Sequence, residues 1–167
     1  MVCGGGLRAV RVEGRRRHRC PRCGWTFYDN PVPAVLALVE RRGRLLLARR
    51  GGPPRAGTWD LPGGFVEGGE HPRRALAREV AEELGARVTR ARLVGFAADD
   101  VYGRGGFPIL AIFYRVTLAG RVRAGSDVAE VAWFPRGRLP LREVGFPGLR
   151  RALQRYARGA PLAEPRA

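Results

Sequence analysis

The sequence contains no lysine, so all 31 of its basic residues other than histidine are arginines. Together with the abundance of alanine, glycine and proline, this choice is typical of a GC-rich genome. Genome bias explains why arginine replaces lysine, but it does not explain why only 15 acidic residues oppose them, which leaves a formal net charge of +16. This excess favours an anionic partner, and we expect a phosphate-rich ligand.

Cysteine is scarce, and the three thiols, Cys3, Cys20 and Cys23, all lie near the N-terminus. The rest of the chain therefore cannot use thiol chemistry, and the local clustering favours a metal site over a disulfide framework. Long apolar runs are also absent: no stretch reaches about 18 consecutive apolar residues, and the N-terminus lacks the apolar segment of a signal peptide. We therefore expect a cytoplasmic protein without a membrane span.

The chain length and a hydrophobic fraction of 45% suffice for one domain with a buried core and a small appendage. Residues 1–30 are rich in glycine and arginine and are too short to bury a core alone, so they need a metal or a neighbour to hold them. The pattern changes at Pro31, and we expect the main domain to span residues 31–160.

Short apolar runs at residues 35–39 and 45–47 predict two buried strands joined as a hairpin. The Pro- and Gly-rich residues 51–57 are expected to form a loop outside the core. The remaining elements complete an α/β sandwich, with strands near 93–98, 109–118 and 128–134, and helices at 72–84 and 148–157.

The helix at 72–84 is predicted because Pro72 suits a first helical turn and Gly85 suits a helix end. Its apolar residues recur every four positions and form one stripe that must face a core. These residues are Leu76, Val80 and Leu84.

Three glutamates of this helix, Glu79, Glu82 and Glu83, are spaced by three and four residues, which crowds their carboxylates on one helical face. Like charges at such positions suggest a cation between them, and oxygen ligands favour Mg²⁺ or Mn²⁺ over softer metals. Gly63 and Gly64 allow close backbone approach, so we count a main-chain carbonyl as a further candidate ligand.

A cation held by these residues suits the cleavage of a diphosphate, because it neutralises phosphate charge and lowers the pKa of a bound water. A nearby carboxylate would accept the proton of that water. Arg78 is positioned to orient one of the glutamates through a charge-assisted hydrogen bond.

A segment beginning at Gly64 resembles the signature of the Nudix hydrolase family, Gly-x5-Glu-x7-Arg-Glu-U-x-Glu-Glu-x-Gly-U, in which U is apolar. Gly64 is followed after five residues by Glu70, and after seven more by residues 78–86, Arg-Glu-Val-Ala-Glu-Glu-Leu-Gly-Ala. The similarity extends upstream over 57–64 and downstream over 130–140. The resemblance implies an α/β/α sandwich with a mixed sheet, and Mg²⁺- or Mn²⁺-dependent hydrolysis of a phosphoanhydride bond.

The resemblance also implies a set of site residues. The metal ligands would be the carboxylates of Glu79, Glu82 and Glu83 and the carbonyl of Gly64, with Arg78 as the orienting residue. We assign Glu79, Arg78 and Glu82 to the catalytic set, with Glu79 as the first choice of general base. The base varies among members of the family, and the alternatives here are Asp99, Asp100, Asp127 and Glu130.

Residues 20–24, Cys-Pro-Arg-Cys-Gly, have the form of a zinc knuckle, in which the glycine permits a turn that aims backbone N–H groups at the thiolates. Cys3 and the glycine after it are similar to the end of a second knuckle. We therefore expect Cys3, Cys20 and Cys23 to bind zinc in a small ribbon that is one ligand short, and three unligated thiols are the alternative. The missing cysteine would precede Met1, which predicts a longer natural chain; an intact native mass equal to these 167 residues would contradict it.

A zinc ribbon followed by a Nudix domain resembles the NADH diphosphatase branch of the family. Residues 87–98 lack the Ser-Gln-Pro-Trp-type segment of that branch, so we do not expect NADH as the sole substrate. The expected substrate is a nucleoside diphosphate linked to another moiety, of the ADP-ribose, dinucleotide or NAD(H) type. A capped RNA would also account for the basic charge.

Two other classes of protein share features with this sequence. An isopentenyl diphosphate isomerase shares the Nudix fold but relies on a catalytic cysteine in the core, which this chain lacks. The alternative to hydrolysis is a nucleotide-sensing or nucleic-acid-binding module with a Nudix fold and an Arg-rich ribbon, although a pure sensor would not need three carboxylates. The oligomeric state stays open between a monomer and the homodimer that many relatives of this fold form.

Overall fold

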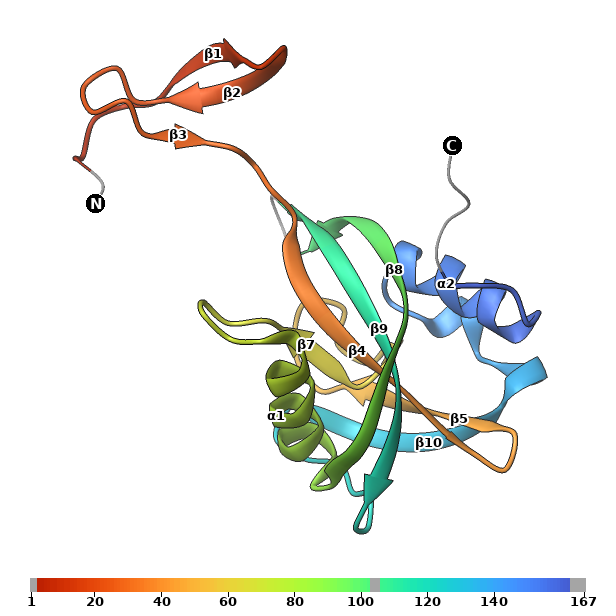
Figure 1. The fold of residues 1–167 in the computed structure, drawn as a ribbon. Coiled ribbons are helices and arrows are strands. Elements are labelled where there is room, and N and C mark those ends of the chain that lie inside the picture. The colour runs from red at the N-terminus through yellow and green to blue at the C-terminus, as the bar shows by residue number, and fades with distance from the viewer. Residues whose placement is uncertain (1–2, 103–105, 163–167) are drawn as a thin grey trace. The chain divides into compact units, whose positions relative to one another are not determined.

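The structure is a computed structural model that describes residues 3–102 and 106–162, with the backbone alone described at 99–102. Contacts between Cα atoms divide the chain into two units, Met1–Pro31 and Val32–Ala167. Figure 1 shows the elements of both units along the chain.

The first unit is built around a small antiparallel sheet. Strands β1 (Arg8–Val12), β2 (Arg15–Arg19) and β3 (Thr26–Phe27) lie in that order, with Arg11 opposite Arg16 and His18 opposite Phe27. The β1–β2 turn is a two-residue turn in which Glu13 and Gly14 both have positive φ, as hairpins with tight connections prefer. No clear apolar alternation marks these strands in the sequence, because arginine fills half of their positions.

The second unit contains a mixed sheet of seven strands in its described part. Its main path runs β10 (Val128–Pro135), β5 (Arg44–Arg50), β4 (Val32–Arg41), β9 (Phe107–Ala119), β8 (Arg87–Tyr102). The two short strands β6 (Trp59–Asp60) and β7 (Gly63–Phe65) pair with β5 and β4. The β4–β9 pair is parallel and the other pairs are antiparallel, which confirms the mixed sheet.

Strands β4 and β5 form the predicted hairpin, with Glu40 opposite Leu45. Their continuous apolar runs are explained by burial on both faces of the sheet. Alternate residues of β4 join two different cores: Val35, Ala37 and Val39 join one, and Leu38 joins the other.

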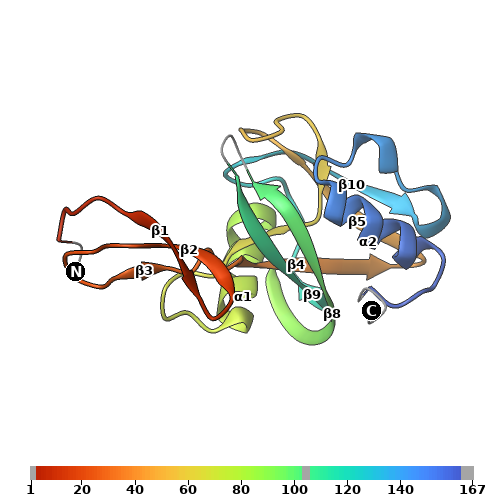
Figure 2. The same ribbon diagram turned by 90° about the horizontal axis from the view of Figure 1, so that it is seen from above.

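Two α-helices cover the two faces of this sheet (Figures 1 and 2). Helix α1 (Pro72–Leu84) buries Leu76, Val80 and Leu84 against the core that contains Val35. Helix α2 (Pro147–Ala157) buries its own apolar stripe against the other core. These two layers of packing confirm the predicted α/β/α sandwich.

The remaining predicted elements are present but differ in length. Strand β8 begins at Arg87, well before residue 93, and its Arg-rich first part pairs with β9 across a register shift between Val88 and Arg90. Helix α2 begins at Pro147 and is preceded by the short 3₁₀ helices η1 (Arg136–Arg138) and η2 (Leu141–Glu143). Neither α1 nor α2, the α-helices of the described ranges, combines the length and apolar character that crossing a bilayer requires.

Candidate active site

Helix α1 is held by specific interactions at both ends, which fixes the direction of its charged face. The His71 side chain caps the first turn by accepting a hydrogen bond from the Arg73 backbone N–H at 3.2 Å. At the other end Gly85 adopts the left-handed conformation and donates to the carbonyl of Ala81 at 3.0 Å. Because Leu76 and its partners face the core, the charged residues are turned toward the loops.

Arg78 is the centre of an ion-pair network on this charged face. Its guanidinium donates to both carboxylate oxygens of Glu70, at 3.2 and 3.0 Å, and to Glu79 at 2.6 Å. It also reaches Glu82 at 3.3 Å and the Phe65 carbonyl at 3.0 Å. The bonds to Glu70 and Glu79 raise the pKa of Arg78 further above its usual range, and the Arg78 bond lowers the pKa of Glu70.

Glu79 lies directly over the backbone of Gly64. A Cβ atom added to Gly64 would fall 2.4 Å from a carboxylate oxygen of Glu79, so only glycine leaves room for this carboxylate. Burial raises the pKa of Glu79, and the bonds from Arg78 oppose that rise. The residue therefore combines a fixed position with a raised proton affinity.

Glu83 is the most deeply buried carboxylate of the helix face. It accepts a hydrogen bond from the Gly63 N–H at 2.9 Å. Burial raises the pKa of Glu83 to about 8, and the nearby charges of Asp127, Asp60 and Glu79 act in the same direction. A cation beside these carboxylates would relieve this accumulation of negative charge.

A cavity of about 240 Å³ opens between these residues and the sheet. Its lining combines acidic and apolar side chains. Arg50 also borders the cavity and pairs with Asp60 at 3.1 Å. The acidic side chains are those of Asp60, Glu67, Glu79, Glu83 and Asp127; the apolar ones include Leu36, Ala97, Ile109, Ala111, Phe146 and Leu149.

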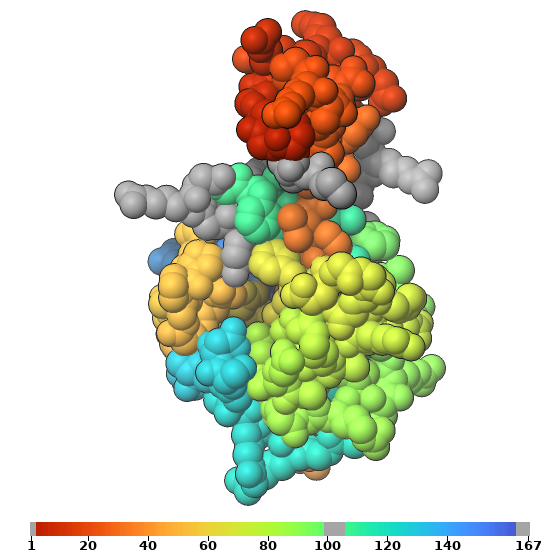
Figure 3. Space-filling view, turned by 90° about the vertical axis from the view of Figure 1, so that its left-hand side faces the viewer, coloured from red at the N-terminus to blue at the C-terminus, as the bar shows by residue number. Residues whose placement is uncertain are grey.

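The chain segments that carry the acidic side chains of the cavity lie side by side. Gly51 donates to the Asp127 carbonyl at 2.7 Å, and Gly125 donates to the Glu83 carbonyl at 2.8 Å. Figure 3 shows this face of the domain, with the loop near residue 51 in gold, α1 in yellow-green and the residues before β10 in cyan. Three chain segments that are distant in sequence thus border one site.

The predicted metal-ligating carboxylates differ in their surroundings. Glu79 and Glu83 line the cavity, whereas the Glu82 side chain is 52% exposed and turned toward Arg78. The sequence pattern suggested carboxylates crowded around a cation; in the structure the Arg78 guanidinium compensates Glu79 and Glu82 instead. The metal-binding roles of Glu79, Glu82, Glu83 and the Gly64 carbonyl remain predictions.

Of the alternative bases, Asp127 borders the cavity and its charge acts on Glu79 and Glu83. Glu130 lies on β10, pairs with Arg49 at 3.0 Å and is not among the residues that line the cavity. The side chains of Asp99 and Asp100 lie outside the described residues.

Sequence reasoning missed Asp60, Glu67 and Arg50 as residues of the cavity. The Arg50–Asp60 contact depends on the pairing of β5 with β6, which no local spacing reveals. The one available signal was the position of Asp60 between Trp59 and Leu61, which are both buried.

The candidate metal-ligating atoms that border the cavity fit a hard divalent cation. Every candidate donor is a carboxylate or carbonyl oxygen, as Mg²⁺ and Mn²⁺ prefer, and no thiol or imidazole lines the cavity among the described residues. Because Gly64 has no side chain, its backbone lies close to the Glu79 carboxylate, one of these candidate donors.

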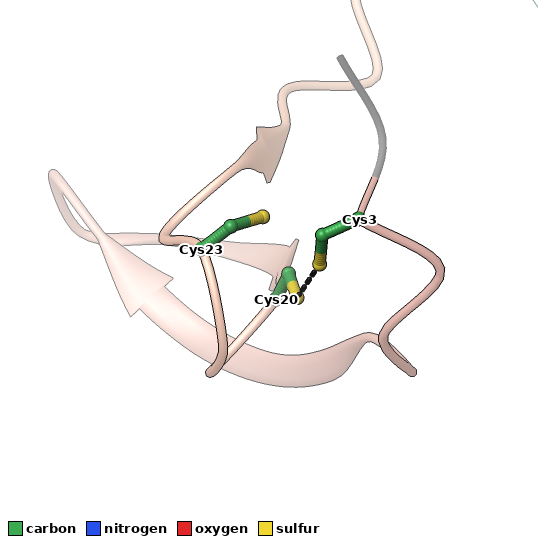
Figure 4. Close-up of side chains that lie close together, drawn as sticks. All are labelled: Cys3, Cys20 and Cys23. Atoms are coloured by element: carbon green, nitrogen blue, oxygen red, sulfur yellow. Dashed lines mark hydrogen bonds between the residues drawn. The ribbon is translucent and has the colours of Figure 1, made fainter.

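The first unit contains a separate cluster, formed by Cys3, Cys20 and Cys23 (Figure 4). Their sulfur atoms all lie within 4.8 Å of one another, and no other set of at least three potential metal ligands in the described residues is as close. The backbone N–H groups of Cys23 and Arg22 lower the pKa of Cys20 to about 7, as expected for a thiolate held by a knuckle. The set of three sulfur atoms fits zinc, and a fourth ligand is absent from this cluster among the described residues.

The fold, the signature and the cavity define one family. Residues 30–156 match the NUDIX domain, and the chain belongs to the Nudix family. This confirms the resemblance found in the sequence.

Particular relatives show how the similarity is distributed. The chain is 33% identical over 116 residues to an ADP-ribose pyrophosphatase of Methanocaldococcus jannaschii, covering 70% of this chain and 69% of that protein. It is 31% identical over 170 residues to the NAD-capped RNA hydrolase NudC of Pseudomonas aeruginosa, covering 98% of this chain but only 58% of the relative. A crystal structure of a Nudix hydrolase from Nitrosomonas europaea is similar with a TM-score of 0.69 and 27% identity, covering 97% of this chain and 93% of that one.

Proposed function

We propose that this protein hydrolyses the phosphoanhydride bond of a nucleoside diphosphate linked to another moiety, with Mg²⁺ or Mn²⁺ as cofactor. The observation that carries the proposal is the mixed lining of the cavity, in which Glu79 and Glu83 border the same space as Phe146 and Leu149. The acidic side chains suit a cation that binds phosphate, and the apolar side chains suit a nucleoside.

The residues proposed to hold the cation are Glu79, Glu82, Glu83 and the carbonyl of Gly64. When bound, it would neutralise phosphate charge and activate water. The protein contributes orientation, because Arg78 fixes Glu79 through a bond of 2.6 Å. Glu79 is the proposed general base, since its buried carboxylate has a raised pKa and so takes up a proton more readily.

The proposed substrates are ADP-ribose and related dinucleotides of the NAD(H) type. The similarity to an ADP-ribose pyrophosphatase, which covers more than two thirds of either protein, supports the first. The similarity to a hydrolase of NAD-capped RNA supports a nucleotide joined to RNA as a second candidate, and it extends over 98% of this chain, the cysteine-containing unit included.

The test compares two glutamine variants at saturating Mg²⁺ with ADP-ribose. Glu83→Gln removes a carboxylate that lines the cavity, whereas Glu143→Gln removes an exposed one that is not part of its lining and serves as the matched control. We expect Glu83→Gln to lower kcat/KM by about 100-fold or more, the scale of losing one preorganised electrostatic group, and Glu143→Gln to change it little. Equal activity of both variants would reject this site.

We further propose that Cys3, Cys20 and Cys23 bind a structural zinc ion. The support is the closeness of their sulfur atoms and the turn that follows two of them, since Gly4 and Gly24 both have positive φ. Elemental analysis of protein purified without chelator tests the proposal. About one zinc per chain would support it, and metal-free protein with three reactive thiols would reject it.

A further inference from the structure

The sheet of the first unit carries aromatic and basic side chains on one of its faces. Cross-strand partners share a face in an antiparallel sheet, so the pairing of Arg11 with Arg16, and of His18 with Phe27, places these four side chains together. Trp25 precedes Phe27 by two residues and its ring lies near the Phe27 ring, with centroids 6.2 Å apart and planes inclined by 28°. We call Arg11, Arg16, His18, Trp25 and Phe27 the aromatic-arginine face.

This face is open to solvent although it contains two large aromatic rings. Trp25 is 42% and Phe27 46% exposed, far more than the buried Trp59 of the second unit. Arg11, Arg16 and His18 are exposed as well. Large rings left exposed beside one another mark a binding surface more often than a structural one.

The two arginines of the face are available to a ligand. Within the described residues, the side chain of neither Arg11 nor Arg16 forms a hydrogen bond or an ion pair. Arg17, on the opposite face, differs: it donates to the Tyr28 carbonyl and its guanidinium lies 5.6 Å from the Tyr28 ring. The guanidinium groups of Arg11 and Arg16 are therefore open to a ligand.

The net positive charge of the first unit favours an anionic partner. Seven arginines stand against two acidic residues, Glu13 and Asp29. Glu13 lies in the β1–β2 turn and Asp29 follows β3, so neither belongs to the strands that form the face. A partner with regularly spaced negative charges and flat rings matches both components of the surface.

We propose, building on the proposed function, that the aromatic-arginine face binds single-stranded RNA without sequence preference. Trp25 and Phe27 would stack on unpaired bases, and Arg11 and Arg16 would contact phosphates. A duplex is excluded because its base faces are covered by stacking. The inferred surface gives the first unit a task of its own, which is to hold an RNA chain whose terminal nucleotide is the proposed substrate.

The experiment measures binding of a fluorescein-labelled, uncapped 12-residue single-stranded RNA to the full chain carrying Glu83→Gln. Anisotropy titrations at several salt concentrations compare Arg11→Ala/Arg16→Ala with Arg8→Ala/Arg15→Ala. The second pair removes the same charge from the same two strands, but Arg8 and Arg15 alternate with the residues of the face and lie on the opposite side. The two variants therefore separate local contact from net charge.

We expect Arg11→Ala/Arg16→Ala to weaken binding about tenfold and to reduce the slope of log K against log salt by about 1.4, since each phosphate contact contributes about 0.7 for a single strand. Arg8→Ala/Arg15→Ala should leave that slope nearly unchanged. Equal losses in both variants would overturn the proposal, because attraction by net charge alone would then explain binding.

The aromatic component is tested separately. Trp25→Leu and Phe27→Leu should each weaken binding about tenfold, within the range for loss of one stacked base, with the salt slope preserved. Trp25→Tyr should restore most of the affinity, and this rescue rules out misfolding as the cause of the loss. Failure of Trp25→Tyr to bind better than Trp25→Leu, or tighter binding of duplex RNA or single-stranded DNA of the same sequence, would overturn the proposal.

These experiments test the RNA surface and the proposed function independently of each other. If the wild-type chain hydrolyses no nucleotide but the Glu83→Gln chain binds RNA through this face, the proposed function fails and the RNA surface stands. If ADP-ribose is hydrolysed but single-stranded RNA does not bind, the RNA surface fails and the proposed function stands.

Discussion

Gly64 and Glu79 meet so closely that the character of one residue determines the position of the other. The Glu79 carboxylate lies where a Cβ atom of residue 64 would otherwise be, and Arg78 donates a hydrogen bond to the same carboxylate. Preorganisation of this kind is more effective than a flexible carboxylate, because the group need not be reoriented during the reaction.

Gly64→Ala should therefore displace Glu79 and lower kcat/KM for ADP-ribose by about 100-fold, the order of loss for a misplacement of about 1 Å. Gly68→Ala is the matched control, since nothing lies within 4 Å of a Cβ at that position and its φ is not positive. Steady-state kinetics at saturating Mg²⁺ measures both. Full activity of Gly64→Ala would show that the Glu79 position does not matter.

Glu83 makes the metal-free protein sensitive to pH. Its pKa is raised from 4.5 to about 8 by burial, so the folded chain holds a proton that the unfolded chain releases. The resulting stabilisation is complete below about pH 4.5 and is lost as the pH rises through about 8. In EDTA, we expect urea midpoints to fall between pH 6 and 9 by a larger amount for the wild type than for Glu83→Gln. Parallel midpoints for the two proteins would contradict this origin of the pH dependence.

At the scale of elements, helix α1 carries the site because its apolar side anchors it to the sheet. Leu76, Val80 and Leu84 are fully buried in one core, whereas the neighbouring Arg74 is exposed. The stability of this helix therefore depends mainly on packing, and the helix itself holds Arg78 and the glutamates in their directions.

Leu76→Ala should destabilise the protein by about 2–5 kcal/mol, the cost of deleting buried methyl groups and leaving a cavity. Arg74→Ala should stay within about 0.5 kcal/mol of the wild type, because it removes a solvated side chain. Denaturant unfolding followed by tryptophan fluorescence measures both values. A loss below about 1 kcal/mol for Leu76→Ala would show that α1 is not anchored as described.

The elements that could be predicted are those whose signals are local. Helix α1 has a proline at its start, a glycine at its end and a periodic apolar stripe, and its predicted bounds match the structure. Strands β4 and β5 were found because full burial produces continuous apolar runs. Strand β8 was predicted too short because bulges break its alternation, and the strands of the first unit were missed because arginine occupies both of their faces.

The same distinction between local and distant signals applies to the residues of the site. The residues of the signature share one helix and one turn, so their spacing reveals them. Asp60, Arg50 and Phe146 reach the cavity only through pairing and packing between distant segments. A bond from Arg78 to one of the glutamates was expected from the sequence, but spacing did not determine which, and Arg78 contacts both Glu79 and Glu82.

At the scale of the whole molecule, the proposed active site and the cysteine cluster belong to different units of the chain. Every residue that lines the cavity belongs to Val32–Ala167, whereas all three cysteines belong to Met1–Pro31. The proposed zinc therefore has no described residue in common with the proposed active site.

Cys23→Ser should lower the zinc content from about one per chain to nearly none while ADP-ribose hydrolysis changes little, because no cavity residue is altered. Elemental analysis and kinetics on the same preparation measure the two effects. A loss of hydrolysis in proportion to the loss of zinc would show that the first unit participates in catalysis.

The most direct test of the central claim is a Mg²⁺-dependent hydrolysis screen, with product identification, of wild type beside Glu83→Gln. The substrates are ADP-ribose, NADH, dinucleoside polyphosphates, nucleoside triphosphates and NAD-capped RNA. We predict that the wild type cleaves ADP-ribose between its two phosphorus atoms, giving AMP and ribose phosphate, that EDTA abolishes the reaction, and that Glu83→Gln lowers kcat/KM by about 100-fold or more. Turnover of none of these substrates by a folded protein that binds Mg²⁺ would contradict the hydrolase and favour a nucleotide-sensing module.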